Sequence, residues 1–454
     1  MGKLENDLGR DGISRLVVRI ALPSMAAQFV SVLYSIVDRM YIGHIAEGGA
    51  LALAGVGICG PVVTMAGSVA FLIAIGGAPL MSMRMGEGRN GEAAHILSTC
   101  AQMLVAAALL LTALVLPLRA PMLRLFGASE AIYPCAEAYF TIYIGGTLFA
   151  LLASGLNQFI IAQGFARTGM LLVMLGAVLN LLLDPVFIFL LGWGVRGAAA
   201  ATVLSQMASA AGALWFLTRG QAAQRITRQP FSAEIAKRVL RLGFAPFSIV
   251  AVDNVMIISM NAVLQRYGGA AQGDMLITCA TIAQSFMLVV TMPLGGISSG
   301  TQTILAFNYG AMRMDRVREG QRRIFSLCVL YTAVMFVLAW LVGPLFVRLF
   351  TRDAQQAALS GWAIRVCTLA IIPLGLQYEV VDGFTALGQV RLSFALSFFR
   401  KLVYFVALFA LPALLGARAA FYAEPVSDVI GPAVSVCVHR IKMDRVLSRR
   451  LEQR

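Results

Sequence analysis

Apolar residues dominate the chain in long runs, and the polar residues are concentrated between these runs. Twelve runs can be counted, most of them about 20 residues or longer, the length that an α-helix needs to cross a hydrocarbon core of about 30 Å. They lie near residues 15–43, 51–82, 93–116, 132–160, 168–191, 197–217, 238–264, 276–308, 324–347, 357–385, 392–415 and 417–439. A membrane β-barrel would instead show alternating segments of about ten residues. The pattern predicts an all-α integral membrane protein with twelve transmembrane helices.

The composition agrees with this prediction and excludes several other classes. Hydrophobic residues make up 59% of the 454 residues and charged residues only 13%, too little polar surface to cover a soluble globule of this size. The first apolar run is too long for the hydrophobic region of a cleaved signal peptide. The seven cysteines are scattered singly without metal-ligand spacing, so we expect them to be packing residues. We also expect no cofactor, and no metal other than Na⁺ at Asp38 and Asp184.

The net charge of +14 is explained by topology rather than by a nucleic-acid partner. An even number of spans places both termini on one side, and about three-quarters of the 36 Lys and Arg residues fall on that side. The positive-inside rule assigns this side to the cytoplasm. We therefore expect a multi-pass protein of the plasma (inner) membrane with both termini cytoplasmic.

Short sequence motifs recur along the chain at one fixed offset. AQGFAR at 162–167 returns as ALGQVR at 386–391, and MRMGEGR at 83–89 returns at the same offset as FNYGAMR at 307–313. Six spans separate equivalent points, so the two halves have the same orientation and form a parallel repeat. This architecture is typical of secondary transporters.

The repeat also predicts the domain organisation. We expect an N-terminal lobe of six helices over 1–217, a cytoplasmic connector over 218–237, and a C-terminal lobe of six helices with a basic cytoplasmic tail over 238–454.

Two acidic residues of the first half lie inside apolar runs, where a charge costs roughly 3 kcal/mol on insertion scales. Asp38 and Asp184 both fall roughly 8 to 11 Å below the outer boundary, at 1.5 Å of helix rise per residue. Thr202 reaches a similar depth on the next segment, and Asn180 precedes Asp184 by four residues on the same helical face. Pro185 removes a backbone hydrogen bond, so we expect a bend and a freed carbonyl nearby.

This set of oxygen ligands fits a small hard cation or a shared proton, so the sequence indicates H⁺ or Na⁺. The structural alternative is that Asp38 pairs with an arginine of another helix and that Asp184 satisfies backbone groups loosened by Pro185. Spacing alone leaves both interpretations open.

At these residues the chain resembles the multidrug and toxic compound extrusion (MATE) family, in particular its prokaryotic branch with an acidic cluster in the first lobe. The resemblance rests on the first helix over Pro23–Asp38, LNQFIIAQGFAR at 156–167, NLLLDP at 180–185, GWGVRGAAAAT at 192–202 and NYGA at 308–311. It implies two six-helix lobes around a central V-shaped cleft. It also implies cation-coupled export of amphipathic, often cationic compounds.

The resemblance further assigns roles to particular residues. The coupling-ion site of similar prokaryotic members corresponds here to Asp38, Asn180, Asp184 and Thr202. Asn157, in the fourth-segment motif, is a candidate for the substrate cavity.

The second half carries its own intramembrane acids. The resemblance implies a second possible coupling site, because some branches of the family use acids of segments seven and ten. Asp253, Glu379 and Asp382 therefore form an alternative coupling set. Glu379 and Asp382 are three residues apart and share one helical face.

Basic residues of segment eleven offer another interpretation for these acids. Arg400 and Lys401 can neutralise some of them, and for Glu424 and Asp428 we favour this structural role.

The sequence as a whole indicates a secondary active antiporter that exports organic compounds in exchange for H⁺ or Na⁺ by alternating access. The alternative is a flippase of lipid-linked or polyprenyl compounds. The sequence contains no nucleophile motif or histidine cluster, so it does not support a membrane-embedded enzyme. It also contains no phosphate-binding loop, so it does not support an ATP-driven pump. The expected partners are a small organic substrate and the lipid bilayer, and we expect a monomer.

Overall fold

The protein is built almost entirely from long helices. The computed structural model describes residues 7–45, 49–126, 128, 130, 132–350 and 353–452; in them lie fourteen α-helices, one π-helix and one 3₁₀-helix, and no strand. The chain forms two compact units. Unit 1 comprises Leu22–Phe247 with the described part of Met1–Arg10, and unit 2 comprises Asp11–Ala21 with Ser248–Arg454.

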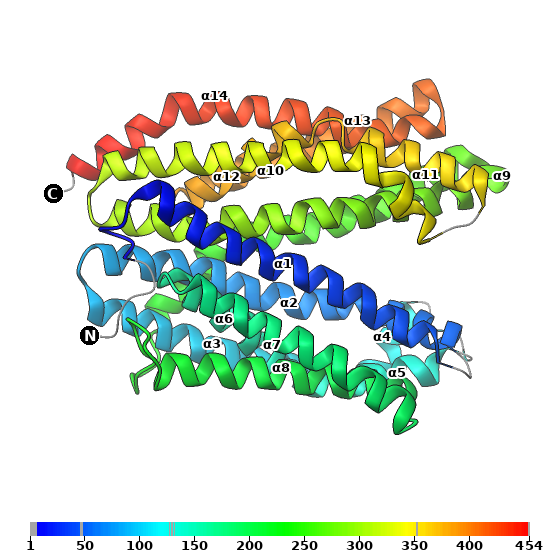
Figure 1. Ribbon diagram of the computed structural model, residues 1–454, viewed down its shortest axis with the longest axis horizontal. Helices are drawn as coiled ribbons and strands as arrows, with labels where there is room; N and C mark the ends of the chain where they lie inside the picture. Colours follow the sequence, from blue (N-terminus) through cyan, green and yellow to red (C-terminus); the bar gives the residue numbers. More distant parts are fainter. Residues whose placement is uncertain are drawn as a thin grey trace. The chain divides into compact units, whose positions relative to one another are not determined.

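Unit 1 holds a bundle of helices in which α6, α7 and α8 run together (Figure 1). Its complete helices are α2 (Gly49–Gly86), α3 (Asn90–Val115), α4 (Arg119–Leu125), α5 (Tyr133–Gly145), α6 (Thr147–Ala162), α7 (Ala166–Pro185), the π-helix η1 (Val186–Leu190) and α8 (Gly194–Thr218).

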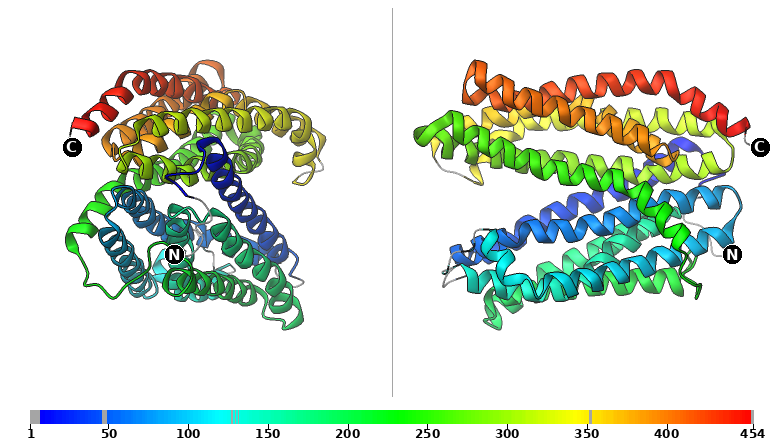
Figure 2. Two further views of the ribbon diagram at one scale, coloured as in Figure 1. Left: turned by 60° about the vertical axis from the view of Figure 1, so that its left-hand side comes forward. Right: turned by 180° about the vertical axis from the view of Figure 1, so that it is seen from behind.

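Unit 2 holds a second bundle, in which α13 and α14 lie side by side (Figure 2). Its complete helices are α10 (Met314–Arg348), α11 (Ala354–Cys367), α12 (Ile371–Ala386), α13 (Val390–Leu415), the 3₁₀-helix η2 (Ala417–Tyr422) and α14 (Ala423–Glu452).

Two helices belong partly to each unit. The helix α1 (Ile13–Gly43) begins in unit 2, where the guanidinium of Arg316 donates a 2.7 Å hydrogen bond to the carbonyl of Asp11 just before it. The helix α9 (Ala233–Gly310) begins in unit 1 and continues in unit 2. It is interrupted at Gly269, whose φ of 60° and ψ of −170° suit glycine alone, and this break separates the two predicted segments 238–264 and 276–308.

The helices account for the predicted spans. Eight described helices are long and apolar enough to cross a membrane, and the bent pairs α5 with α6 (53°) and α11 with α12 (47°) raise this to ten. The two remaining predicted segments are also helical, in the first part of α9 and in α14, whose apolar run is interrupted by Glu424 and Asp428.

The repeat inferred from the sequence is visible in the helix boundaries. At the offset of the short motifs, the first residue of α3 corresponds to the first residue of α10, and the first residue of α7 to that of α13. The helices α6 and α12 correspond at both their first and their last residues. The repeat therefore extends from short motifs to whole structural elements.

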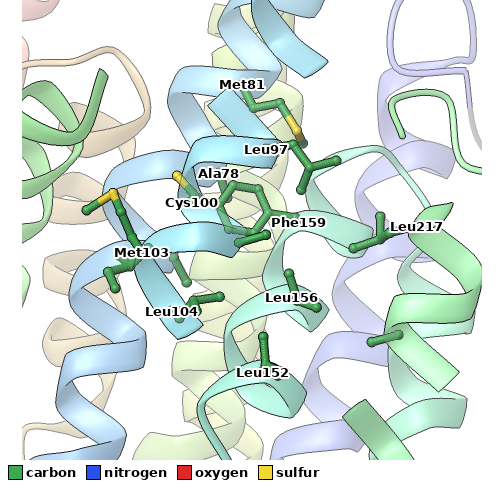
Figure 3. Close-up of a cluster of buried hydrophobic side chains, with 14 of the residues drawn as sticks. Ala78, Met81, Leu97, Cys100, Met103, Leu104, Leu152, Leu156, Phe159 and Leu217 are labelled. Atoms are coloured by element: carbon green, nitrogen blue, oxygen red, sulfur yellow. The ribbon is translucent and has the colours of Figure 1, made fainter. Parts of the chain in front are cut away.

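Close packing of small and apolar side chains holds the core of unit 1 together (Figure 3). A side chain at Gly77 would come within 2.7 Å of the sulfur of Cys100 and 2.8 Å of the ring of Phe159. Since lipid tails are as apolar as these residues, such close contact, rather than exclusion from water, stabilises helix association in a bilayer. Five of the seven cysteines are buried, as predicted for packing residues, whereas Cys135 is half-buried and Cys437 is exposed.

Candidate functional site

The polar residues of α7 and α8 meet inside unit 1. Asn180 and Asp184 lie one turn apart and are 3% and 1% exposed. The side-chain amide of Asn180 donates a 3.1 Å hydrogen bond to Oδ1 of Asp184 and a longer one, 3.5 Å, to the hydroxyl of Thr202. Thr202 in turn donates to the carbonyl of Ala198, 2.9 Å away. The spacing in the sequence thus correctly predicted that these three side chains come together.

The carboxyl group of Asp38, on α1, lies within hydrogen-bonding range of Asp184. Two carboxyl groups can form such a bond only when a proton lies between them, and a cation can take the place of that proton. Among the described residues, no Lys or Arg forms a salt bridge with Asp184. The arrangement therefore provides two acids and two neutral oxygen-bearing side chains for one small cation.

The backbone next to Asp184 is unusual. The helix α7 ends at Pro185, and the π-helix η1 follows at once, with the amide of Leu191 bonded to the carbonyl of Val186 at 2.9 Å. The sequence predicted a bend at this proline, and the structure shows the wider turn of a π-helix, a feature found frequently at functional sites. Gly197 of α8 packs here, since a side chain on it would come within 2.7 Å of the Phe187 carbonyl.

Two tyrosines that the sequence pattern did not single out lie near Asp38. Tyr34 on α1 and Tyr139 on α5 lie within electrostatic range of the Asp38 carboxyl group. The rings of Tyr139 and Tyr143 stack with their centroids 5.9 Å apart, and Gln206 of α8 lies within hydrogen-bonding range of Tyr143. The i, i+4 spacing of the two tyrosines on α5 was the available signal, but it did not show which helix they face.

Asn157 occupies a different place in unit 1. It is 7% exposed on α6, and its Oδ1 lies 3.1 Å from the position that a side chain on Gly169 of α7 would take. It is therefore a packing neighbour of the first turns of α7, more than two turns from Asn180.

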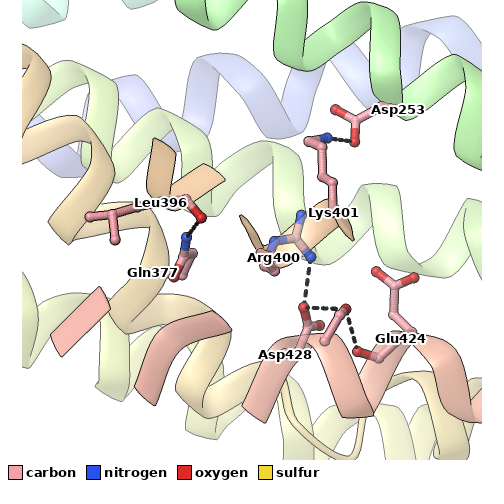
Figure 4. Close-up of polar contacts among 8 residues, drawn as sticks. Asp253, Gln377, Leu396, Arg400, Lys401, Glu424 and Asp428 are labelled. Atoms are coloured by element: carbon pink, nitrogen blue, oxygen red, sulfur yellow. Dashed lines mark hydrogen bonds and ion pairs between the residues drawn. The ribbon is translucent and has the colours of Figure 1, made fainter. Parts of the chain in front are cut away.

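Two ion pairs connect the acids of unit 2 with α13 (Figure 4). Lys401, which is 2% exposed, pairs with Asp253 on α9. Arg400 pairs with Asp428 on α14 at 2.7 Å. These contacts confirm that the two basic residues neutralise some of the acids, whereas the Glu424 carboxylate near them has no salt bridge among the described residues.

Glu379 and Asp382, the other members of the alternative coupling set, take no part in these ion pairs. They are on α12, and Asp382 accepts a hydrogen bond from Ser298 of α9. Asp253 therefore has a lysine partner, whereas Glu379 and Asp382 form no salt bridge with Lys or Arg among the described residues.

The fold and this site together describe a multi-span helical membrane protein with a repeated bundle and an acidic pair beside a π-helix. The family model described as MatE matches residues 23–186 and 250–409, one match in each half of the repeat. The chain belongs to this family, the MATE transporters, so it is a transporter of small organic substrates and not an enzyme.

The chain is similar to curated relatives over nearly its whole length. It is 25% identical over 430 residues to the FAD transporter of Shewanella oneidensis, covering 92% of both chains. It is 22% identical over 424 residues to the multidrug export protein MepA of Staphylococcus haemolyticus, covering 92% of this chain and 91% of the relative.

Solved structures share the fold. A multidrug resistance MATE family transporter of the MOP superfamily, in its outward-facing conformation, matches with a TM-score of 0.91 and 21% identity, over 98% of this chain and 99% of the other. A MOP superfamily transporter from Pyrococcus furiosus, whose binding pocket is described as reversed in polarity, matches with a TM-score of 0.89 and 22% identity, over 97% and 98%.

Proposed function

We propose that this protein exports amphipathic, often cationic organic compounds in exchange for H⁺ or Na⁺. The observation that carries the proposal is the approach of Asp38 to Asp184, with Asn180 and Thr202 beside them. A cation bound by this cluster favours one conformation of the transporter by differential affinity, and by linkage it lowers affinity for the exported compound.

The finer features of this proposal follow from the sequence. The chain represents the prokaryotic branch with an acidic cluster in the first lobe. It functions as a monomer in the plasma (inner) membrane. Both termini are cytoplasmic, because basic residues concentrate on the side of the membrane where the termini lie. Its two halves alternate access between the two sides.

The test is efflux of a fluorescent cationic dye from proteoliposomes under a proton gradient alone and under a sodium gradient alone. We expect the wild type to export dye under one of the gradients and Asp38→Asn to lose most of this activity. Asp315→Asn, the same chemical change on a fully exposed side chain of α10, is the matched control and should export normally. Normal export by Asp38→Asn would contradict the role of the acidic pair.

A flavin nucleotide is a second candidate cargo, because one relative of similar length is a FAD transporter. FAD loaded into the same vesicles tests this directly. Gradient-driven loss of FAD without dye export would replace the cationic substrate class, and movement of a lipid-linked sugar alone would favour a flippase.

A further inference from the structure

The exposed face of α10 in unit 2 changes from apolar to basic along the helix. Its apolar side chains that are at least half exposed, together with that of its C-cap, recur every three or four residues and form the apolar stripe of α10: Leu330, Val334, Val337, Leu341, Leu345 and Leu349. The stripe spans about 28 Å of helix, close to a hydrocarbon core of about 30 Å. Arg323 lies two turns before Leu330 on the same face, and Arg322 lies beside it; both are exposed. These arginines therefore lie where lipid acyl chains give way to headgroups.

The helix α14 lies beside this part of α10. The guanidinium of Arg318 on α10 pairs with Asp444 on α14 at 3.0 Å. The rings of Phe325 and His439 meet edge to face, with their centroids 5.4 Å apart. The residue numbers rise along one helix as they fall along the other, so the two helices are antiparallel here.

One turn nearer the apolar stripe, the same two helices carry two arginines instead of an ion pair. Arg322 follows Arg318 by four residues on α10, and Arg440 precedes Asp444 by four residues on α14. Both Arg322 and Arg440 are exposed, and among the described residues neither forms a salt bridge. Two neighbouring guanidinium groups without an acid favour the binding of an anion.

The acids of this region do not neutralise these arginines. Asp315 and Asp444 both lie within salt-bridge distance of Arg318. Glu319 is exposed one turn before Arg323, and within the described ranges it forms no salt bridge. One carboxylate is therefore left beside three arginines, and the surface is basic.

Unit 1 shows what lies along the same face in the other half of the repeat. The repeat offset relates three polar residues of α3 to three of α10, namely His95, Ser98 and Gln102 to Glu319, Arg322 and Ser326. In unit 1 the connector between α8 and α9 forms a hydrogen bond of 2.9 to 3.0 Å with each of the three, from the backbone of Thr227, Gln229 and Pro230. Ser98 is 1% exposed as a result. The three corresponding residues of unit 2 are all exposed, so this face is open to lipid.

We propose that Arg322, Arg323 and Arg440 bind the headgroup of an anionic phospholipid such as phosphatidylglycerol, whose acyl chains lie along the apolar stripe of α10. A guanidinium group binds two phosphate oxygens at once. A zwitterionic headgroup brings its own cation, so the excess of arginine selects an anionic one. The lipid takes in unit 2 the place that the connector takes in unit 1. This inference depends neither on the cargo nor on the coupling ion of the proposed function.

The test is native mass spectrometry of the full-length protein, which measures the dissociation constant of the first bound lipid. The protein in detergent micelles is titrated with phosphatidylglycerol, with phosphatidylethanolamine and, as a headgroup without chains, with inorganic phosphate. The variants are Arg322→Gln with Arg323→Gln, Arg440→Gln alone, and Glu319→Gln. The matched control is Arg445→Gln with Arg449→Gln, which removes the same charge from exposed residues of α14 farther from the apolar stripe.

We expect the wild type to bind phosphatidylglycerol more tightly than phosphatidylethanolamine. An arginine near a lipid surface contributes roughly fivefold in affinity, so the double variant should bind phosphatidylglycerol about 25-fold more weakly and Arg440→Gln about fivefold more weakly. The control should bind it as the wild type does, and Glu319→Gln should bind it more tightly. Unchanged binding of phosphatidylethanolamine shows that each variant remains folded.

Three results would overturn the inference. Equal losses in the control and in the double variant would show a general effect of charge rather than a site. Phosphatidylglycerol binding that is unchanged in the double variant and in Arg440→Gln would place the lipid elsewhere. Displacement of the lipid by inorganic phosphate would show a site for a soluble anion.

Discussion

The ion pair between Arg400 and Asp428 allows the energetics of a buried charge in unit 2 to be measured. The Asp428 side chain is fully buried, that of Arg400 is 14% exposed, and the pair is 2.7 Å long (Figure 4). Replacing Asp428 by Asn leaves the guanidinium buried without its partner, a change that costs about 3–5 kcal/mol in proteins. We expect about 3 kcal/mol, the lower end, because Glu424 remains within electrostatic range of Arg400.

The assay is reversible unfolding in mixed detergent micelles, followed by circular dichroism. Asp315→Asn, on an exposed residue, should change the free energy of unfolding by less than about 0.5 kcal/mol. The double variant Arg400→Met with Asp428→Leu removes both charges, so it should recover most of the loss. A loss below about 1 kcal/mol for Asp428→Asn, as for a surface pair, or no recovery in the double variant, would refute this reasoning.

Three further changes test the packing and the site of unit 1. Gly243→Ala places a methyl group 1.8 Å from the Leu72 carbonyl oxygen, where backbone must move, so we expect a loss of about 3 kcal/mol in the same unfolding assay. Gly197→Ala presses on the carbonyl of Phe187 in η1 and should lower dye efflux without loss of folded protein, as judged by size-exclusion chromatography. Thr202→Val removes the hydroxyl, which accepts the 3.5 Å hydrogen bond from Asn180 and donates one to the Ala198 carbonyl. Only the bond from Asn180 reaches the acidic pair, and it is worth about 1 kcal/mol, so the apparent ion affinity measured in efflux should fall less than tenfold.

Local features of the site were predictable from the sequence because they depend on helical spacing. Asn180 and Asp184 are four residues apart and meet as expected, and Pro185 marks the place where regular helix ends. The approach of Asp38 depends on the packing of α1 against other helices of unit 1, so depth alone suggested it without showing it.

Features that depend on side-chain direction between helices were not predictable. The sequence suggested that Lys401 neutralises an acid but did not select Asp253, which lies 148 residues away. Likewise, the spacing of Glu379 and Asp382 predicted a shared face. It did not indicate that Gln302 of α9 lies within hydrogen-bonding range of Asp382, because spacing along one helix does not show which residues of another helix face it.

The assignment of Asp11–Ala21 to unit 2 has a consequence for folding during synthesis. The carbonyl of Asp11 receives its hydrogen bond from Arg316, 305 residues later in the chain. At about 5–20 residues per second, a ribosome takes roughly 15 to 60 s to make the intervening chain. The start of α1 is therefore among the first segments to be made, yet it must wait without its unit 2 neighbours until the second half of the protein has been translated.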